Sequence, residues 1–423
     1  MAQQFIIEGG KKLKGEITVL GSKNAAGALL AACLLTDQPC VIDNLPLVKD
    51  ILNLLEILKE MGVEVEFLSE RKVKITAGSN VDPEKISYEK FSQARTSVLL
   101  IGPLAARFKQ FKVSRPGGDK IGLRPITTHL DVLEKLGVEV KEDGDFYCFK
   151  TKNLIGQEIV LPEFSVTATE NLLMTACLAQ GQTIIKLAAQ EPHVLCLVEQ
   201  LRKMGASIEK TSENCFSIKG TAGQLLAGVE QTVIADYIEA GTFIIIGALA
   251  GQEVLVKNAV PEYLDSFLER LGATGAHFQV MGNDVRVWPA DSLKAIRLQA
   301  LPYPGFPTDL LPLMVPVLTQ AKGKSLIHDP LYENRLNYIH QLRKMGADIE
   351  MVDPHRAFVF GPTPLMGVSI ESWDIRAGAS LLVAGLISQG KTVINNIEQI
   401  DRGYEKIEER LRGLGADIKR VSA

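Results

Sequence analysis

The sequence predicts an α/β fold of six repeated modules, with buried helices at the centre and sheets outside. A Leu-x-x-x-Gly phrase recurs six times, and its glycines are spaced 75, 68, 70, 71 and 69 residues apart, at Gly62, Gly137, Gly205, Gly275, Gly346 and Gly415. An Ala-, Leu- and Gly-rich apolar run also recurs six times, beginning at Ala25, Ser97, Glu170, Gly241, Leu310 and Gly378. Fixed-period self-similarity indicates a repeat architecture, and a period of about 70 residues is long enough for a small α/β module.

Each module is expected to hold two helices of different kinds. The apolar run predicts a helix that is apolar on nearly every side and therefore buried, and the β-branched residues after it predict a strand. The Leu-x-x-x-Gly motif predicts the C-terminal end of an amphipathic helix. One example is the apolar stripe of Val194, Leu197, Leu201 and Met204, after which Gly205 ends the helix. Because an all-round apolar helix must be covered, the buried helices are expected to pack together beneath the sheets, which gives an inside-out arrangement.

Length and composition narrow the class of protein. The 423 residues suggest two to three domains, and six modules divide most simply into two domains of three. A net charge of −4 without a basic block argues against nucleic-acid binding. The N-terminus lacks a signal-peptide pattern and the apolar runs are shorter than the roughly 20 residues that span a bilayer. We therefore expect a cytoplasmic protein without membrane insertion.

Cysteines and histidines give no sign of a disulfide framework or a metal centre. None of the six cysteines forms a C-x-x-C pair, and the six histidines are scattered. Reduced thiols and no metal site are the expected outcome.

Three irregular segments between the predicted elements carry candidate functional groups. Lys23 and Asn24 stand at the start of a buried helix, where free N–H groups and the helix dipole favour an anion. The glycine-rich loop 115–125 has Asp119 at its tip, with Lys120 and Arg124 nearby, as in a loop that closes over an anionic substrate. Asp309 follows a proline-rich segment and precedes a buried helix, which suits either a fixed base or an N-cap.

Several arginines are also expected near loop or helix starts. Their planar, bidentate guanidinium groups suit phosphate and carboxylate. They are Arg95, Arg124, Arg335, Arg376 and Arg402.

Taken together, these segments resemble the motifs of the UDP-N-acetylglucosamine 1-carboxyvinyltransferases, enolpyruvyl transferases that open peptidoglycan synthesis. The strings are GSKNAA, PGG-x-x-IG-x-RP, S-V-T-A-T-E-N, FPTD, ENR, D-x-R and DRGYE, and they cover essentially the whole chain. The resemblance implies the family's two-domain inside-out α/β barrel, the enolpyruvyl transferase fold. Residues 22–233 would form a first domain with the mobile loop 115–125, and residues 1–21 with 234–423 a second domain with the candidate base.

The resemblance also implies a reaction. The enolpyruvyl group of phosphoenolpyruvate passes to the 3′-hydroxyl of UDP-N-acetylglucosamine, with release of phosphate, by addition and elimination through a tetrahedral ketal. No metal or organic cofactor is implied. The expected partners are these two small-molecule substrates, and protein partners are not predicted.

Residue roles follow from the resemblance by position. The expected catalytic residues are Asp119, Lys23, Asp309 as the base, and Arg402. Lys23, Arg124 and Arg402 would clamp phosphoenolpyruvate, and Asp374 and Arg376 would be supporting charges. Contacts to the nucleotide sugar or to loop closure would come from Asn24, Arg95, Ser165, Val166, Thr167, Leu331 and Arg335.

Asp119 departs from the family pattern. Most members carry a cysteine at the loop tip, the thiolate that fosfomycin alkylates, whereas this chain has a carboxylate, a much weaker nucleophile. We therefore predict insensitivity to fosfomycin. An aspartate has an unperturbed pKa of about 3.9, so Asp119 is expected to donate a proton near neutral pH only if loop closure desolvates it. Smaller departures are Ile126 and Thr127 in place of Val-Asp, and Tyr237 in place of arginine.

Three rival interpretations remain at this point. The sister enzyme 3-phosphoshikimate 1-carboxyvinyltransferase shares the fold and the phosphoenolpyruvate chemistry, but its LGNAGT-type phrase is absent from this chain. A catalytically silent regulator that binds a UDP-sugar is the second alternative. A transferase specific for a different nucleotide sugar is the third.

Overall fold

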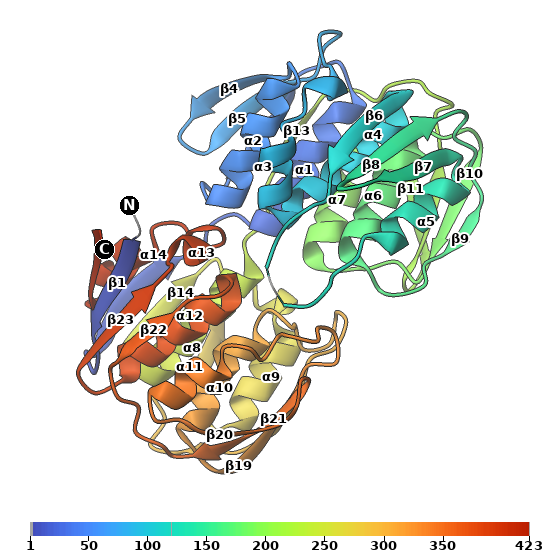
Figure 1. Cartoon of the computed structure of the whole chain (residues 1–423). Coiled ribbons are helices and arrows are strands. Elements are labelled where there is room, and N and C mark those ends of the chain that lie inside the picture. Colours follow the sequence, from blue (N-terminus) through green and yellow to red (C-terminus); the bar gives the residue numbers. More distant parts are fainter. Residues whose placement is uncertain (1–2, 120, 423) are drawn as a thin grey trace. The chain divides into compact units, whose positions relative to one another are not determined.

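The computed structural model describes residues 3–119 and 121–422, and the chain forms two compact units within them. We call residues 3–20, 119, 121–124 and 235–422 the terminal unit, and residues 21–118 and 125–234 the inner unit. Each unit has its own hydrophobic core. Among the described residues, each unit contains three β-sheets (Figure 1). The expected division at 22–233 stays a prediction.

Six helices that are almost entirely buried form the centres of the two units. Those of the inner unit are α1 (Lys23–Ala32), α4 (Ile101–Arg107) and α6 (Val166–Cys177). Those of the terminal unit are α8 (Tyr237–Ala250), α10 (Leu311–Thr319) and α12 (Ile375–Ile387). They coincide with the six apolar runs of the sequence, and sheets cover them within each unit, so the expected buried helices are confirmed.

Each central helix is followed by a strand that enters a sheet. These strands are β3 (Cys40–Asp43), β6 (Gln110–Ser114), β10 (Gln182–Lys186), β14 (Gly251–Lys257), β19 (Ala321–His328) and β23 (Lys391–Asn395). In five modules a second, parallel strand lies beside it, and these are β13 (Val229–Thr232), β9 (Glu158–Val160), β2 (Leu13–Thr18), β17 (Leu293–Lys294) with β18 (Arg297–Gln299), and β22 (Ser369–Glu371). The short β6-β8-β7 sheet has no such strand among the described residues.

Amphipathic helices lead into hairpins at the predicted positions. The helices are α2 (Lys49–Glu60), α5 (Thr127–Lys135), α7 (Pro192–Lys203), α9 (Asp265–Ala273), α11 (Ile339–Lys344) and α14 (Ile407–Gly413). The six glycines of the repeated phrase follow them with φ between 85° and 104°, the left-handed conformation that favours glycine. Five of the helices precede the hairpins β4 (Glu64–Ser69)–β5 (Lys72–Thr76), β7 (Val138–Asp143)–β8 (Phe146–Thr151), β11 (Ser207–Ser212)–β12 (Cys215–Lys219), β15 (His277–Met281)–β16 (Asp284–Trp288) and β20 (Asp348–Asp353)–β21 (Arg356–Gly361).

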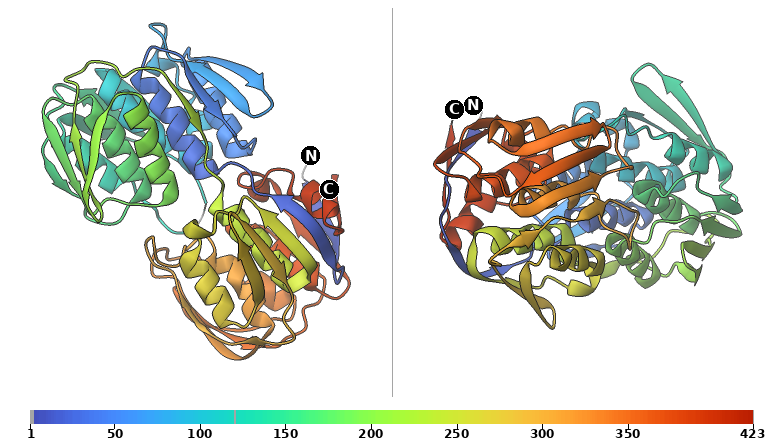
Figure 2. Two further views of the ribbon diagram at one scale, coloured as in Figure 1. Left: turned by 180° about the vertical axis from the view of Figure 1, so that it is seen from behind. Right: turned by 90° about the horizontal axis from the view of Figure 1, so that it is seen from below.

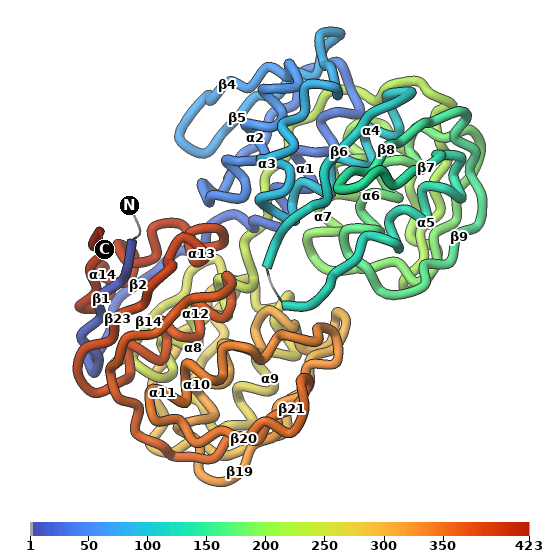
Figure 3. The backbone as a smooth tube through the Cα atoms, viewed as in Figure 1, coloured from blue at the N-terminus to red at the C-terminus, as the bar shows by residue number. Residues whose placement is uncertain are grey.

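The sixth module is completed by the beginning of the chain. Strand β1 (Gln3–Glu8) lies between β23 and β24 (Asp417–Ser422) and is antiparallel to both. The two ends of the described chain therefore lie side by side in one sheet, as Figures 2 and 3 show by the blue strand beside red ones. Within the described residues, no helix is both long enough and apolar enough to cross a membrane.

Candidate active site

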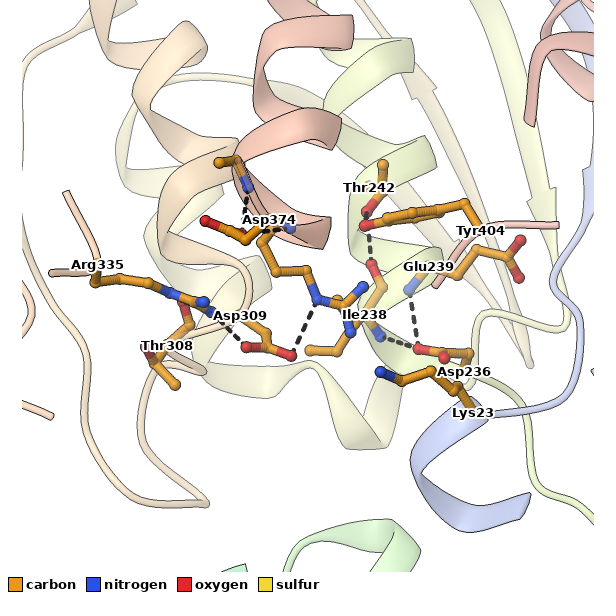
Figure 4. Close-up of polar contacts among 12 residues, drawn as sticks. Lys23, Asp236, Ile238, Glu239, Thr242, Thr308, Asp309, Arg335, Asp374 and Tyr404 are labelled. Carbon is orange, nitrogen blue, oxygen red and sulfur yellow. Dashed lines mark hydrogen bonds and ion pairs between the residues drawn. The ribbon is translucent and has the colours of Figure 1, made fainter. Parts of the chain in front are cut away.

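Asp309 is held between two buried arginines of the terminal unit. Its Oδ1 accepts a hydrogen bond from Nη2 of Arg335, and its Oδ2 accepts one from Nε of Arg376 at 3.0 Å (Figure 4). The Asp309 side chain is 30% exposed, against 1% for Arg335 and 4% for Arg376. The carboxylate is thus fixed in orientation while part of it remains open to solvent.

The two arginines are fixed by different parts of the fold. Arg335 also donates from Nε and Nη2 to the carbonyl oxygen of Thr308, at 3.3 and 3.1 Å, and Arg376 lies in the first turn of α12. Burial lowers the pKa of each arginine, but the surrounding acidic groups, Asp309 foremost among them, together outweigh burial and raise both pKa values. Leu310, rather than Asp309, is the N-cap residue of α10, so the side chain of Asp309 does not serve as a helix cap.

Asp374 caps α12 beside this pair. Its Oδ1 accepts from the backbone N–H groups of Arg376 and Ala377, both at 2.9 Å, while its buried Oδ2 has no hydrogen-bond partner among the described residues. Burial raises the pKa of Asp374, the charge of Arg335 lowers it, and the charge of Asp119 raises it. The supporting carboxylate expected from the sequence therefore lies within electrostatic range of Arg335 and of the loop tip.

A buried tyrosine extends the polar cluster. The Arg376 guanidinium carbon lies 5.5 Å from the ring centroid of Tyr404, and the Tyr404 hydroxyl contacts Oγ1 of Thr242 at 2.8 Å (Figure 4). Burial raises the pKa of Tyr404, while Arg376 lowers it. Tyr404 belongs to the DRGYE string, but only the arginine of that string was selected from the sequence, because a tyrosine there shows no chemistry until its partners are known.

The tip of the 115–125 loop contacts the predicted arginine Arg402. Oδ1 of Asp119 lies 2.6 Å from Nη1 of Arg402, and only 13% and 10% of the two side chains are exposed. Arg402 also donates from Nη1 to Oε1 of Gln399 at 3.0 Å. Arg124 lies 5.6 Å from the ring centroid of Tyr332, and Lys120 lies outside the described residues. Asp119, Arg124 and Arg402 therefore belong to the same unit as Asp309.

Leu331 lies in the loop that precedes Arg335. Its N–H donates to Oδ1 of Asp329 at 2.9 Å, and its side chain is exposed. Asp329 also accepts a bond from the hydroxyl of Thr308, so this buried carboxylate connects the Leu331 loop to the Asp309 segment. No sequence signal had distinguished Asp329 from a surface aspartate.

In the inner unit, the start of α1 carries Lys23 with an acidic partner. Ser22 caps the helix by accepting from the N–H of Ala25 at 3.3 Å, and Asn24 follows Lys23 in the first turn. Nζ of Lys23 lies 3.3 Å from Oδ2 of Asp50 on α2, and the side chains are 12% and 4% exposed. Asp50 fixes the ammonium near the helix N-terminus. The sequence did not identify it because the pairing spans two helices.

Ser165, Val166 and Thr167 open α6 in the inner unit. Ser165 is the N-cap and accepts from the N–H of Ala168 at 3.4 Å, and Oγ1 of Thr167 contacts Nε2 of His129 at 2.7 Å. The first-turn N–H groups and the helix dipole favour an anion at this end. Arg95, also in the inner unit, donates from Nη2 to the carbonyl oxygen of Pro125 at 3.2 Å.

Comparison with known proteins decides the family. The profile of the family described as EPSP synthase (3-phosphoshikimate 1-carboxyvinyltransferase) matches residues 7–411. UDP-N-acetylglucosamine 1-carboxyvinyltransferase of Koribacter versatilis is 42% identical over 421 residues, covering 99% of this chain and 96% of the relative. UDP-N-acetylglucosamine 1-carboxyvinyltransferase 1 of Carboxydothermus hydrogenoformans is 40% identical over 420 residues, covering 99% of both chains. The chain belongs to the UDP-N-acetylglucosamine 1-carboxyvinyltransferases.

Solved structures support the fold of this family. The enolpyruvyl transferase NikO from Streptomyces tendae superposes with a TM-score of 0.92 at 24% identity, over 100% of this chain and 99% of that one. EPSP synthase from Acinetobacter baumannii gives a TM-score of 0.75 at 20% identity, with both chains fully covered. The predicted enolpyruvyl transferase fold is confirmed. The full-length relatives named above favour the UDP-N-acetylglucosamine branch of the family over its 3-phosphoshikimate branch.

Proposed function

We propose that this chain transfers the enolpyruvyl group of phosphoenolpyruvate to the 3′-hydroxyl of UDP-N-acetylglucosamine and releases phosphate, the first committed step of peptidoglycan synthesis. The proposal is supported mainly by the two relatives that match 99% of the chain at 42% and 40% identity. We further propose a cytoplasmic location, where both substrates would be available.

The reaction has two steps with a balanced exchange of bonds. In the addition, the 3′ oxygen bonds to C2 of phosphoenolpyruvate, its proton leaves, and C3 gains a proton, which gives a tetrahedral ketal. In the elimination, C3 loses a proton and the bond from C2 to the phosphate oxygen breaks. The chain must therefore supply a base for the hydroxyl, an acid for C3, and cations for the phosphate and carboxylate.

Asp309 is the proposed base. Arg335 binds its Oδ1 and Arg376 binds its Oδ2. The side chain is 30% exposed, which leaves the carboxylate accessible to a hydroxyl group. Fixed orientation is what a positioned base needs, because proton transfer requires hydrogen-bond reach in a defined geometry. Asp374 and Arg376 support this arrangement from the first turn of α12.

Three cationic side chains are assigned to phosphoenolpyruvate. We propose Lys23, Arg124 and Arg402 for this role, with Lys23 as a further candidate for proton transfer. Lys23 is held by Asp50, and Arg402 is held by Asp119 and Gln399, so protein side chains orient both of these cations. Asn24, Arg95, Leu331, Arg335 and the segment 165–167 are proposed contacts to the nucleotide sugar.

Asp119 is the proposed proton donor to C3 and the reason for fosfomycin insensitivity. Its side chain is 13% exposed and forms an ion pair with Arg402, which is a proposed contact of phosphoenolpyruvate. An oxygen nucleophile of this kind attacks an epoxide far more slowly than a thiolate does.

Release of phosphate tests the proposal. The initial rate is measured with phosphoenolpyruvate alone, with UDP-N-acetylglucosamine, and with shikimate 3-phosphate, each with and without preincubation with fosfomycin. Release that requires UDP-N-acetylglucosamine and survives fosfomycin supports the assignment and the role of Asp119. Release that requires shikimate 3-phosphate favours the sister enzyme, and binding without release favours the silent regulator. Sensitivity to fosfomycin refutes only the argument about Asp119.

A further inference from the structure

Residues 121 and 122 lie against the 332–335 loop. The N–H of Asn334 donates to the carbonyl oxygen of Ile121 at 2.9 Å, and the Ile121 side chain is only 3% exposed. Gly122 lies so close to Glu333 that an added Cβ would come within 2.1 Å of Oε2. Together with the Asp119–Arg402 ion pair, these contacts dock residues 119 and 121–124 within the terminal unit.

Tyr332 lies at the centre of this docking region. The guanidinium carbon of Arg124 is 5.6 Å from its ring centroid, and that of Arg335 is 5.8 Å away. Both distances lie within the range at which the negative face of an aromatic ring attracts a cation. The ring of Tyr332 therefore contacts both Arg124 of the loop and Arg335, which binds Asp309.

The two arginines are not equally constrained. Arg335 is buried and bonded to Asp309 and to the Thr308 carbonyl, whereas Arg124 belongs to a glycine-containing loop segment and has a positive φ of 45°. Two like charges near one ring also repel each other, and the electron-rich face offsets that repulsion. Loss of the ring would therefore displace Arg124 rather than Arg335.

We propose that Tyr332 is a positioning residue that holds Arg124, and with it the docked loop, in the place needed for phosphoenolpyruvate. The ring acts through its π face, so phenylalanine is expected to replace it and an aliphatic residue is not. The catalytic consequence rests on the proposed function. The docking of the loop does not depend on it and can be measured without substrate.

Limited trypsin digestion measures the docking directly. The loop holds three basic residues, but Arg115 and Arg124 both precede proline and such bonds resist trypsin, which leaves Lys120–Ile121 as its cleavable bond. Cleavage in a native protein follows the population of the open form when opening is fast. The rate at this bond is read by mass spectrometry as the appearance of fragments 1–120 and 121–423.

Four proteins are compared: the parent, Tyr332→Phe, Tyr332→Leu and Tyr263→Leu. Tyr263 is another partly buried tyrosine of the terminal unit, outside the docking region, and provides the matched control. Tyr332→Leu is expected to speed cleavage at Lys120–Ile121 by about 2- to 5-fold, the effect of losing one partly exposed cation–π contact. Tyr332→Phe and Tyr263→Leu are expected to match the parent.

Steady-state kinetics then separates a positioning role from a purely structural one. In Tyr332→Leu, the KM for phosphoenolpyruvate is expected to rise by a similar factor while kcat changes little, and Tyr332→Phe restores the parental KM. Unchanged cleavage in Tyr332→Leu, or equal acceleration in Tyr332→Phe or Tyr263→Leu, would overturn the proposal. If the parent releases no phosphate at all, the proposed function fails, and the digestion alone still decides the role of Tyr332.

Discussion

Replacement of Asp309 by asparagine tests whether this carboxylate compensates two buried positive charges. The substitution keeps the size and planar shape of the side chain but removes its charge. Arg335 and Arg376, at 1% and 4% exposure, then face a neutral amide. An amide also places an NH2 donor where the carboxylate presented its second oxygen, so one of the two arginines loses the acceptor it faced.

The expected loss of stability follows from the burial of the three groups. Removal of one partner from a buried ion pair costs about 3–5 kcal/mol. The figure is reduced here because Asp309 is 30% exposed and solvent screens part of the interaction. We therefore expect Asp309→Asn to lower the free energy of unfolding by about 1–3 kcal/mol. At an m value of about 2 kcal/mol per M, the urea midpoint falls by about 0.5–1.5 M.

The fluorescence of the two tryptophans provides a local assay. Trp288 and Trp373 both lie in the terminal unit, so urea unfolding followed by their emission reports on the unit that contains Asp309. Glu253→Gln is the matched control, because its ion pair with Arg286 has an N–O distance of 3.9 Å and is exposed. Such a surface pair contributes at most about 1 kcal/mol.

Equal midpoints for the parent and Asp309→Asn would refute the reasoning, since two buried guanidinium groups would then tolerate the loss of their shared counter-charge. A loss of the same size in Glu253→Gln would refute it as well, because burial would not be the cause. A loss confined to Asp309→Asn supports the account.

Three further predictions concern single side chains. Burial, and to a lesser extent the charge of Glu191, raises the pKa of Glu170 well above its ordinary value. Above the pKa that Glu170 has in the unfolded state, the folded protein therefore keeps a proton that the unfolded protein has lost. The free energy of unfolding then falls as pH rises from the unfolded-state pKa through the folded-state pKa. Glu170→Gln should remove that fall, so the free energy of unfolding of the variant should gain on that of the parent as pH rises above the ordinary glutamate pKa of about 4.3. Urea unfolding followed by circular dichroism measures both, and parallel curves would contradict the prediction. Asp119→Cys should become inactivated by fosfomycin with one covalent adduct in its mass spectrum, and an unmodified mass would count against the nucleophile argument. Arg402→Lys, which replaces a planar fork by a point charge, should raise the KM for phosphoenolpyruvate by about 10-fold or more, and an unchanged KM would exclude Arg402 from the clamp.

The elements of the fold were predictable because each module repeats two local patterns. An all-round apolar helix such as α8 and an amphipathic helix such as α7 differ in the periodicity of their apolar residues, and glycine marks the end of the second kind. The place of β1 was not predictable in this way. It pairs with β23 and β24, almost the whole length of the chain away, and no local pattern records a partner at that distance.

The candidate site shows the same limit. Asp309 and Arg335 stand in irregular segments and Arg376 in the first turn of α12, and all three were selected from the sequence, but the convergence of the two arginines on Asp309 depends on tertiary structure. Asp50 and Tyr332 were missed for the same reason, because an aspartate in a helix and a tyrosine in a loop are ordinary until Lys23 and Arg124 are found beside them.

The most direct test of the central claim follows the enolpyruvyl carbon itself. Phosphoenolpyruvate labelled with carbon-13 at C2 is incubated with the protein and UDP-N-acetylglucosamine, and the product is examined by nuclear magnetic resonance. The label is expected in a vinyl ether on the 3′ oxygen of the sugar, with one phosphate released for each label transferred. Label that remains in phosphoenolpyruvate, or that appears only in free pyruvate, would contradict it.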